Sequence, residues 1–344
     1  MVAIEDIRVS NAKFKESKQA EGLVAVFIGA TSGIGLGTLK QFAKQSSSPQ
    51  IYIVGRSESA AVSILKELEL LNPKATYVFQ ETEITLLKNV DKVCEEIKSK
   101  KEKVDILFMS PAYITLGERN DTIEGIDIPY ALTYYARLRF AYNLLPLLSA
   151  SSAPRVISIL GGGLESEIDL EDLELKNNFK AQKAMKYSTT QTTLAFEELA
   201  NSNPSITFIH KYPGFVNTGA IGRFLGSQKG LFAIPATFFK WFLLPIVNLM
   251  AVSVDEAGER GLFLATSARY PPRKPRSGGV EATVLPKGAE VAEDIEGSGV
   301  YILGPSDDSK KVTPALATLR SQGASKIVWE FTLSVFDRAV GASE

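Results

Sequence analysis

The chain has 344 residues, of which 45% are hydrophobic, and its formal net charge is −1 at neutral pH. Binding to nucleic acid needs clustered Lys and Arg, and no stretch here is strongly basic, so nucleic acid is excluded as the main partner. The single cysteine, Cys94, excludes an internal disulfide framework and a cysteine-rich metal site, so we expect no metal and a reducing, cytoplasmic location. Charged residues occur within residues 1–7, and no apolar segment follows them, so we expect no signal peptide.

Strand and helix patterns alternate from residue 23 onward, after a polar N-terminal arm that we expect to pack on the domain. Short apolar runs predict strands, and longer segments with helical spacing follow them. In one such segment, 57–71, four apolar residues share a face: Ala60, Ile64, Leu65 and Leu68. The predicted strands are 23–28, 50–54, 76–80, 104–109, 154–160, 205–211 and 300–303. This alternation predicts an α/β protein in which a parallel sheet of about seven strands carries helices on both faces.

The first predicted strand runs into a glycine-rich turn, and a helical stretch follows. Gly29 lets the chain leave the strand in a tight turn, and Gly33 lets the backbone approach a phosphate without a Cβ in the way. Gly35 lets the new helix pack close to the sheet, and the helix N-terminus offers unpaired N–H groups to a pyrophosphate. The order of strand, glycine turn and helix therefore predicts a dinucleotide site.

The second predicted strand ends in Gly55, Arg56 and Ser57, at the position that distinguishes the two nicotinamide cofactors. An acidic residue here would bind the ribose hydroxyls of NAD. Arg56 can instead pair with a 2′-phosphate, so the sequence favours NADP, with a solvated surface arginine as the alternative interpretation.

These residues make the chain similar to the short-chain dehydrogenase/reductase family, over about residues 23–220 and again at 300–303. The family's T-G-x-x-x-G-x-G loop corresponds to 28–35, with only the leading Thr replaced. Three further matches carry the resemblance: Glu83 where the family has an Asp near the adenine, Ser110 in place of an Asn, and the Pro213–Thr218 segment, which lies against the nicotinamide. The resemblance implies these cofactor-binding residues: Gly29, Thr31, Ser32, Gly33, Ile34, Gly35, Arg56, Ser57, Glu83, Ser110, Tyr187, Gln191, Pro213, Gly214, Val216 and Thr218.

The family reduces carbonyls or oxidises alcohols with a Tyr-x-x-x-Lys pair, a Ser and usually an Asn. A lysine ammonium stabilises the phenolate of the tyrosine, whose reference pKa is about 10, so that it exchanges protons near neutral pH. Here Tyr187 matches the tyrosine, but Gln191 stands at the lysine position. The serine position falls at or beside Gly161, and the Asn position falls near Thr133. The resemblance therefore implies Tyr187, Gln191 and Thr133 as catalytic positions, with one of the four usual residue types kept.

Other side chains offer alternatives at this site. Ser158 is a displaced serine or, by strand alternation, a sheet residue. Tyr134 and Tyr135 are alternative proton donors, although core packing is the favoured role of each. His210 lies in the sixth predicted strand, where a satisfied buried histidine is favoured over a catalyst.

We expect a single doubly wound, Rossmann-type domain over residues 1–344. It divides into an N-terminal arm (1–22), a nucleotide-binding core (23–220), an insert that covers the substrate (221–298), and a last strand with C-terminal helices (299–344).

The segment 230–252 is apolar and aromatic, but Lys240 lies near its middle and two prolines interrupt it. A membrane span needs about 20 predominantly apolar residues, so we expect a buried helix pair or a lid over an apolar pocket, with membrane-surface contact as the alternative. The stretch 270–298, rich in Pro and Gly, predicts a long surface loop.

The favoured function is an NADP-dependent oxidoreductase of an apolar carbonyl or alcohol, with Tyr187 as proton donor. The run at 134–146 resembles a divergent fungal subgroup that often accompanies secondary-metabolite pathways. Because the lysine and serine are replaced, two alternatives stay open: a non-redox isomerase, dehydratase or cyclase, and a catalytically silent nucleotide-binding protein. The resemblance also implies a homo-oligomer, unless the C-terminal insert blocks the family's usual interfaces.

Overall fold

The computed structural model describes residues 2–113, 117–226, 251–275 and 290–341. Its strands are β1 (Val24–Ile28), β2 (Gln50–Gly55), β3 (Thr76–Glu81), β4 (Ile106–Met109), β5 (Arg155–Ile159), β6 (Thr207–Lys211) and β7 (Val300–Leu303). They form one parallel sheet in the order β3-β2-β1-β4-β5-β6-β7, which confirms the predicted α/β class and strand pattern. The strand order reverses between β1 and β4, and such a reversal opens a crevice at the carboxyl ends of the strands.

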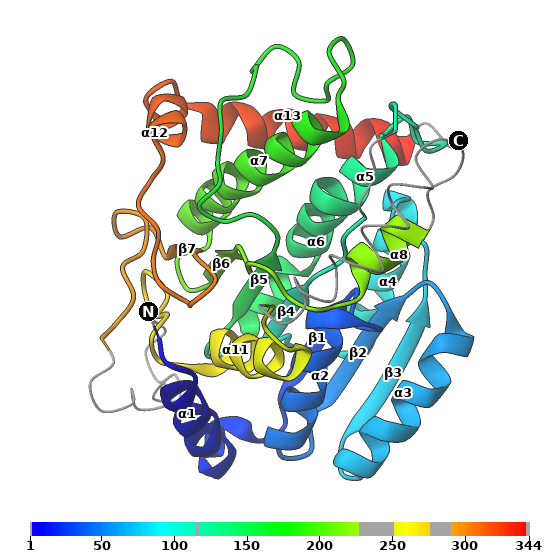
Figure 1. Cartoon of the computed structure of the whole chain (residues 1–344), viewed down its shortest axis with the longest axis vertical. Helices are drawn as coiled ribbons and strands as arrows, with labels where there is room; N and C mark the ends of the chain where they lie inside the picture. Colours follow the sequence, from blue (N-terminus) through cyan, green and yellow to red (C-terminus); the bar gives the residue numbers. More distant parts are fainter. Residues whose placement is uncertain (1, 114–116, 227–250, 276–289, 342–344) are drawn as a thin grey trace.

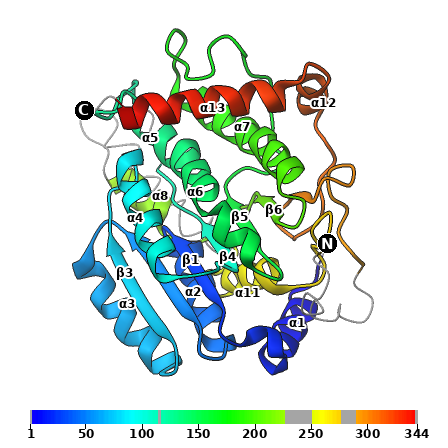
Figure 2. The same ribbon diagram turned by 180° about the vertical axis from the view of Figure 1, so that it is seen from behind.

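Helices cover both faces of the sheet (Figures 1 and 2). One face carries α1 (Ile4–Glu16), α2 (Gly33–Gln45), α3 (Glu58–Leu71) and α11 (Val254–Thr266). The other carries α4 (Leu87–Lys100), α5 (Ile128–Tyr130), a wide helical turn at Ala131–Tyr135, α6 (Ala136–Ala150), α7 (Ala181–Ser202), α12 (Pro314–Ser321) and α13 (Ala324–Gly341). The short α8 (Ala220–Gly226) follows β6.

The central strands form because their side chains are apolar on both sides, as a sheet covered by helices requires. All five residues of β1 are buried, and successive side chains point to opposite faces. Val24, Val26 and Ile28 join the core beneath α4 and α6, whereas Ala25 and Phe27 join the core beneath α2 and α11.

The N-terminal arm packs on the domain, but it is a helix rather than an irregular polar segment. Ile7 and Phe14 of α1 are buried, and Asn11 Nδ2 donates to the Glu259 carbonyl oxygen of α11 at 3.0 Å. The prediction missed this helix because its buried apolar residues are few. In α3, Ala60 is exposed and the buried position is Ala61, so the predicted apolar face was shifted there by one residue.

The predicted substrate-covering insert contains α11, which lies instead against α2, on the face of the sheet that α1 also covers. The two helices cross so closely that a Cβ added to Gly258 would lie 2.5 Å from the carbonyl carbon of Gly37. The α11 part of the insert therefore packs on the hydrophobic core. Residues 230–250 of the predicted lid or membrane-contacting segment lie outside the described residues, as do residues 276–289 of the predicted loop. Among the described residues, no helix is long and apolar enough to cross a membrane.

Candidate nucleotide and active site

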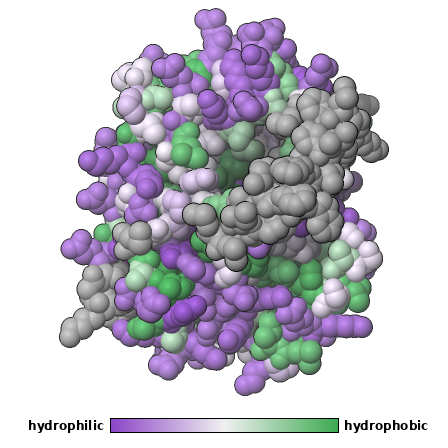
Figure 3. All heavy atoms as spheres, in the orientation of Figure 1, coloured by the Kyte–Doolittle hydropathy of each residue, from purple (hydrophilic) through white to green (hydrophobic). Residues whose placement is uncertain are grey.

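A cavity of about 360 Å³ opens at the carboxyl ends of β1, β2, β4 and β5, where the strand order reverses. Ligand cavities of small-molecule enzymes commonly lie at this position in doubly wound folds. In the space-filling view, hydrophobic side chains show in a hollow near the middle of the molecule (Figure 3). The cavity is lined by Gly29, Thr31, Ser32, Gly33, Ile34, Val54, Gly55, Arg56, Thr82, Ile84, Ser110, Pro111, Ala112, Leu132, Ile159, Leu160, Met185, Pro213, Thr218, Ala220 and Arg223.

The glycine turn has the geometry that its sequence predicts. Gly29 has φ +75°, and a Cβ there would lie 2.7 Å from the Pro111 Cα. Gly33 has φ +58°, and its Cβ would lie 3.0 Å from the Thr218 side chain. The Ser32 side chain makes no capping hydrogen bond at the start of α2. The backbone of the turn therefore faces the cavity without side chains in the way, and the helix N-terminus is suited to bind a pyrophosphate.

Gly35 follows Gly33 by two residues and faces the strand ends rather than the cavity. A Cβ at this position would fall 2.8 Å from the Gly29 carbonyl oxygen and onto Ser110 Oγ. Ser110, which lines the cavity, also donates to that carbonyl at 3.3 Å. Close packing between helix and sheet, the role predicted for Gly35, is thus what the structure requires of it.

Two arginines are the only charged side chains among the described lining residues. Arg56 follows β2, and Arg223 lies in α8. Within the described part of the chain, no carboxylate oxygen lies within 4 Å of either guanidinium. The cavity is therefore positively charged, as an anionic cofactor requires.

Besides Gly35, Tyr187 and Gln191, four predicted cofactor contacts lie outside this lining. Glu83 is exposed, and its carboxylate accepts hydrogen bonds from Thr85 N at 3.2 Å and Thr85 Oγ1 at 3.0 Å, while its neighbours Thr82 and Ile84 line the cavity. Ser57 caps α3, since its Oγ accepts from the Ala60 N–H at 3.2 Å. The remaining two are Gly214 and Val216.

The predicted catalytic pair is buried away from the cavity lining. Tyr187 is 2% exposed, and its hydroxyl oxygen accepts from the Asp169 N–H at 2.8 Å. Gln191 is 1% exposed; its Oε1 accepts from the Tyr130 hydroxyl, and its Nε2 donates to the Leu173 carbonyl at 3.0 Å. Both side chains hold the segment 164–180 that leads from β5 into α7, and neither lines the cavity, so their catalytic role stays a prediction.

A different side of α7 faces the cavity. Met185 lines it, and Thr189 lies one turn further along, where its Oγ1 would be 2.5 Å from a Cβ on Gly161. These residues precede Tyr187 and Gln191 by two positions, which is about 200° around a helix. At the predicted serine position, the space that a side chain would need is thus filled by Thr189.

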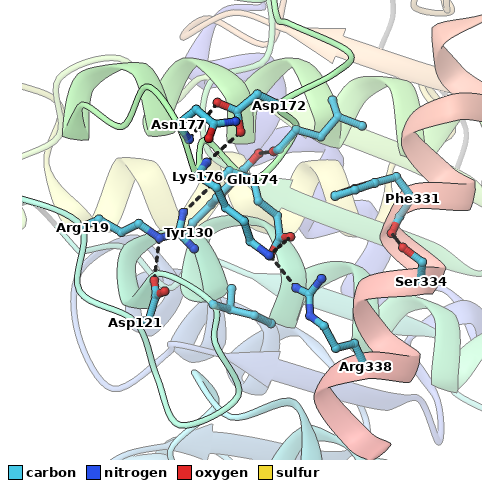
Figure 4. Close-up of polar contacts among 12 residues, drawn as sticks. Arg119, Asp121, Tyr130, Asp172, Glu174, Lys176, Asn177, Phe331, Ser334 and Arg338 are labelled. Carbon is cyan, nitrogen blue, oxygen red and sulfur yellow. Dashed lines mark hydrogen bonds and ion pairs between the residues drawn. The ribbon is translucent and has the colours of Figure 1, made fainter. Parts of the chain in front are cut away.

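The segment that Tyr187 and Gln191 hold is also fixed from its outer side (Figure 4). The Glu174 carbonyl accepts from Arg119 Nη1 at 2.6 Å, and its carboxylate pairs with Arg338 of α13 at 2.6 Å. The Asp172 carboxylate accepts from the N–H groups of the residues four and five positions later. Contacts from the segment before α5, from α7 and from α13 therefore fix one loop conformation.

The remaining catalytic candidates on the helices are also internal. Thr133 is buried; its hydroxyl donates to the Pro129 carbonyl at 2.8 Å and lies 2.8 Å from Ser188 Oγ. The Tyr134 hydroxyl pairs with Thr332 Oγ1 of α13 at 2.6 Å, and Tyr135 is fully buried beside it. Burial raises the pKa of both phenols, so neither is suited to proton transfer near neutral pH.

His210 holds the turn at the end of β5. The Gly161 N–H donates to His210 Nε2 at 3.2 Å, so Nδ1 carries the proton and lies 2.8 Å from Thr193 Oγ1. Thr193 in turn donates to Glu165 Oε1 at 2.8 Å. Burial lowers the pKa of His210 to about 3, which keeps the ring neutral. It is a satisfied core histidine, the role favoured from sequence.

Ser158 is a sheet residue, and it is paired with an arginine that sequence reasoning missed. Arg137 is fully buried; its Nη1 donates to Ser158 Oγ at 2.7 Å and to the Ile159 carbonyl at 3.0 Å, and its Nη2 donates to the Pro111 carbonyl. Two of these partners, Ile159 and Pro111, line the cavity. The signal available was an arginine on the apolar face of a helix, which is rarely buried without a role.

The glycine turn, the two arginines that line the cavity and the reversal of strand order together make this a dinucleotide-binding α/β protein. Residues 23–223 match the family model described as short chain dehydrogenase, which is more than half of the chain. The chain therefore belongs to the short-chain dehydrogenase family, whose members are oxidoreductases that bind a nicotinamide cofactor and a small-molecule substrate.

Similar proteins agree with this assignment. Oxidoreductase AN1596 of Emericella nidulans is 42% identical over 344 residues and covers 99% of both chains. Oxidoreductase andH of Emericella variicolor is 35% identical and covers 100% of this chain and 99% of its own. Among solved structures, YwfH, an NADPH dependent reductase involved in Bacilysin biosynthesis, superposes with a TM-score of 0.54 at 17% identity, over 71% of this chain and 91% of that one. L-sorbose reductase from Gluconobacter frateurii, complexed with NADPH and L-sorbose, gives 0.51 at 19% identity, over 71% and 90%. The two structures show the shared fold.

Proposed function

We propose that this protein is an NADP(H)-dependent oxidoreductase that acts on an apolar carbonyl or alcohol. The observation that carries the proposal is the pairing of the glycine turn with Arg56 in one cavity. A bound nicotinamide would supply or accept the hydride. The NADPH named with YwfH and with L-sorbose reductase supports the same cofactor.

Arg56 carries the preference for NADP over NAD. It lines the cavity at the end of β2, where an acidic side chain would instead bind ribose hydroxyls. A guanidinium offers a planar set of donors that matches the geometry of a phosphate. Because no described carboxylate pairs with Arg56, its donors are available to a 2′-phosphate.

The proposal is tested with Arg56→Ala, using quenching of protein fluorescence to measure the Kd of NADPH and of NADH. Hydrogen bonds to a charged group contribute about 1.5–3 kcal/mol, so the Kd of NADPH should rise by about 10- to 150-fold. The Kd of NADH should change less than about twofold, because NADH lacks the 2′-phosphate. Arg8→Ala, on the exposed surface of α1, is the matched control. Equal losses for both nucleotides would refute the phosphate role of Arg56.

The other end of the cavity favours an apolar substrate. Leu132, Ile159, Leu160, Met185 and Pro213 line it. Their side chains offer aliphatic and thioether surface, which binds apolar groups by excluding water. We propose a small apolar metabolite as the substrate, and the fungal source of the similar oxidoreductases agrees with a role in secondary metabolism.

A second candidate function is favoured by one observation. The described cavity lining holds no carboxyl, imidazole, amine, phenol or thiol side chain, and its only charged side chains are Arg56 and Arg223. Acid–base assistance contributes about 10²–10⁴ in rate to such reactions. The alternative is a non-redox enzyme, or a silent binding protein, that keeps the nucleotide as a scaffold. Product formed with stoichiometric consumption of NADPH would exclude the alternative, and product formed without consumption would exclude the oxidoreductase.

A further inference from the structure

We propose that Arg223 is a second cationic anchor in the cavity and that it binds the pyrophosphate shared by NADPH and NADH. The inference rests on the proposed function, because it assigns a further residue to the same cofactor. Arg223 lies on α8, the short helix that follows the Pro213–Thr218 segment, and it lines the cavity.

The segment after β6 passes beside the glycine turn, and Arg223 follows in the next helix. Thr218 lies against Gly33, whose added Cβ would meet the Thr218 side chain at 3.0 Å. The Arg223 N–H donates to the Gly219 carbonyl at 3.0 Å, at the start of α8. Arg223 is thus one turn of helix from Gly219, and the preceding residue, Thr218, touches the turn expected to hold phosphates.

The side chain of Arg223 is exposed, and it folds back over this connection. Its Nη1 donates to the Thr218 carbonyl at 3.2 Å and lies 3.2 Å from the position of a Cβ on Gly219. A guanidinium has five donors, and only this one bond occupies it among the described residues. The backbone bond holds the guanidinium beside Thr218, whose side chain lies against Gly33, and leaves donors for a phosphate oxygen.

The surroundings of the two cavity arginines distinguish their roles. Arg56 follows Gly55, whose added Cβ would meet Thr31 at 2.9 Å, so this arginine belongs to the β2 side of the turn. Arg223 reaches the turn from the β6 side, through Thr218. The helix N-terminus between these two sides favours a pyrophosphate. We therefore assign the 2′-phosphate to Arg56 and the pyrophosphate to Arg223.

The experiment compares Arg223→Gln and Arg223→Lys with the wild-type full chain and with Arg8→Gln, by titration of NADPH, NADH and 2′,5′-ADP without substrate. Arg223→Gln should raise the Kd of NADPH and of NADH by the same factor, on the order of 10- to 100-fold, since both share the pyrophosphate. Its effect on 2′,5′-ADP, which has no pyrophosphate, should stay below about threefold. Arg223→Lys keeps the charge and should recover part of the affinity.

Each other outcome has a definite meaning. A loss confined to NADPH would place the 2′-phosphate at Arg223 and overturn the inference. Unchanged Kd values of NADPH and NADH in Arg223→Gln would also overturn the inference. If the KM of an acidic substrate rose in the same variant, the anion bound by Arg223 would be that substrate. If the wild-type protein binds neither nucleotide, the proposed function itself fails; if it binds NADPH and Arg223→Gln does so equally well, only the role of Arg223 fails. Because Arg223 is exposed, thermal unfolding of the variants should match that of the wild type.

Discussion

His210 is the only histidine of the chain, which makes its buried hydrogen-bond network directly testable by pH. Nε2 accepts from the Gly161 N–H, and Nδ1 lies against Thr193 Oγ1, which donates to Glu165. A second proton would have to go on Nε2, where the Gly161 N–H already occupies the lone pair. We therefore expect the ring to stay neutral in the folded protein, protonated on Nδ1, from pH 7.5 down to 5.

The size of the effect follows from the difference between two pKa values. In the unfolded chain a histidine titrates near pH 6.5. In the folded protein, burial, together with the charge of Arg137, lowers the pKa of His210 to about 3. Below pH 6.5 only the unfolded state takes up the proton, so the stability present above that pH is lost as pH falls toward 3. Linkage of one proton gives a loss of about 2 kcal/mol in the free energy of unfolding between pH 7.5 and 5.

Two measurements check this expectation. A long-range ¹H–¹⁵N correlation spectrum of the folded protein should show one imidazole, in the Nδ1–H tautomer, whose shifts do not move between pH 7.5 and 5. Urea unfolding at the same pH values should show that His210→Gln, whose amide oxygen can accept from Gly161 but cannot gain a proton, lacks about 2 kcal/mol of the wild-type pH dependence. Burial also raises the pKa of Glu165 and Glu197. These two carboxyls therefore change the free energy of unfolding in the opposite direction, because their protonation at low pH favours the folded state. Both proteins keep those carboxyls, so the difference isolates His210. A ring that titrates near 6.5, or identical pH dependence of the two proteins, would refute the reasoning.

Two further substitutions address the anchoring of the loop and the packing of the glycine turn. Tyr187→Phe leaves the Asp169 N–H without its acceptor and should lower the free energy of unfolding by about 1–3 kcal/mol in urea, while the Kd of NADPH changes less than about twofold. If it abolished hydride transfer at unchanged stability, Tyr187 would be catalytic after all. Gly35→Ala places a Cβ 2.8 Å from the Gly29 carbonyl and should cost about 1–3 kcal/mol and weaken NADPH binding. Gly341→Ala is its control, since an added Cβ there meets nothing within 4 Å, and equal stability of the two variants would count against the close packing.

The strands and the glycine turn could be predicted because their signals are local. In β1 every residue is apolar, so the burial of both faces is visible in five consecutive letters. At Gly29 and Gly33 the backbone itself is the functional group, and a positive φ together with absent side chains is encoded by the residue type alone. Arg56 could likewise be predicted from local sequence, because its position is fixed by the end of β2. Helix α1 was missed because its packing depends on α11, more than 200 residues later in the chain.

The catalytic positions could not be predicted in the same way, because a motif on a helix fixes residue types and spacing but not the rotation of the helix about its axis. Tyr187 and Gln191 have the right spacing, yet an offset of two residues, about 200°, separates their side from that of Met185 and Thr189. The rotation is set by distant partners: the Tyr130 hydroxyl, 61 residues before Gln191, and the Asp169 N–H, 18 residues before Tyr187. A lysine at the position of Gln191 would meet the Tyr130 hydroxyl and the Leu173 carbonyl in a buried site, and burying such a charge is costly. The replacement of lysine by glutamine is therefore consistent with the rotation of α7, because an amide can satisfy one acceptor and one donor there without a charge.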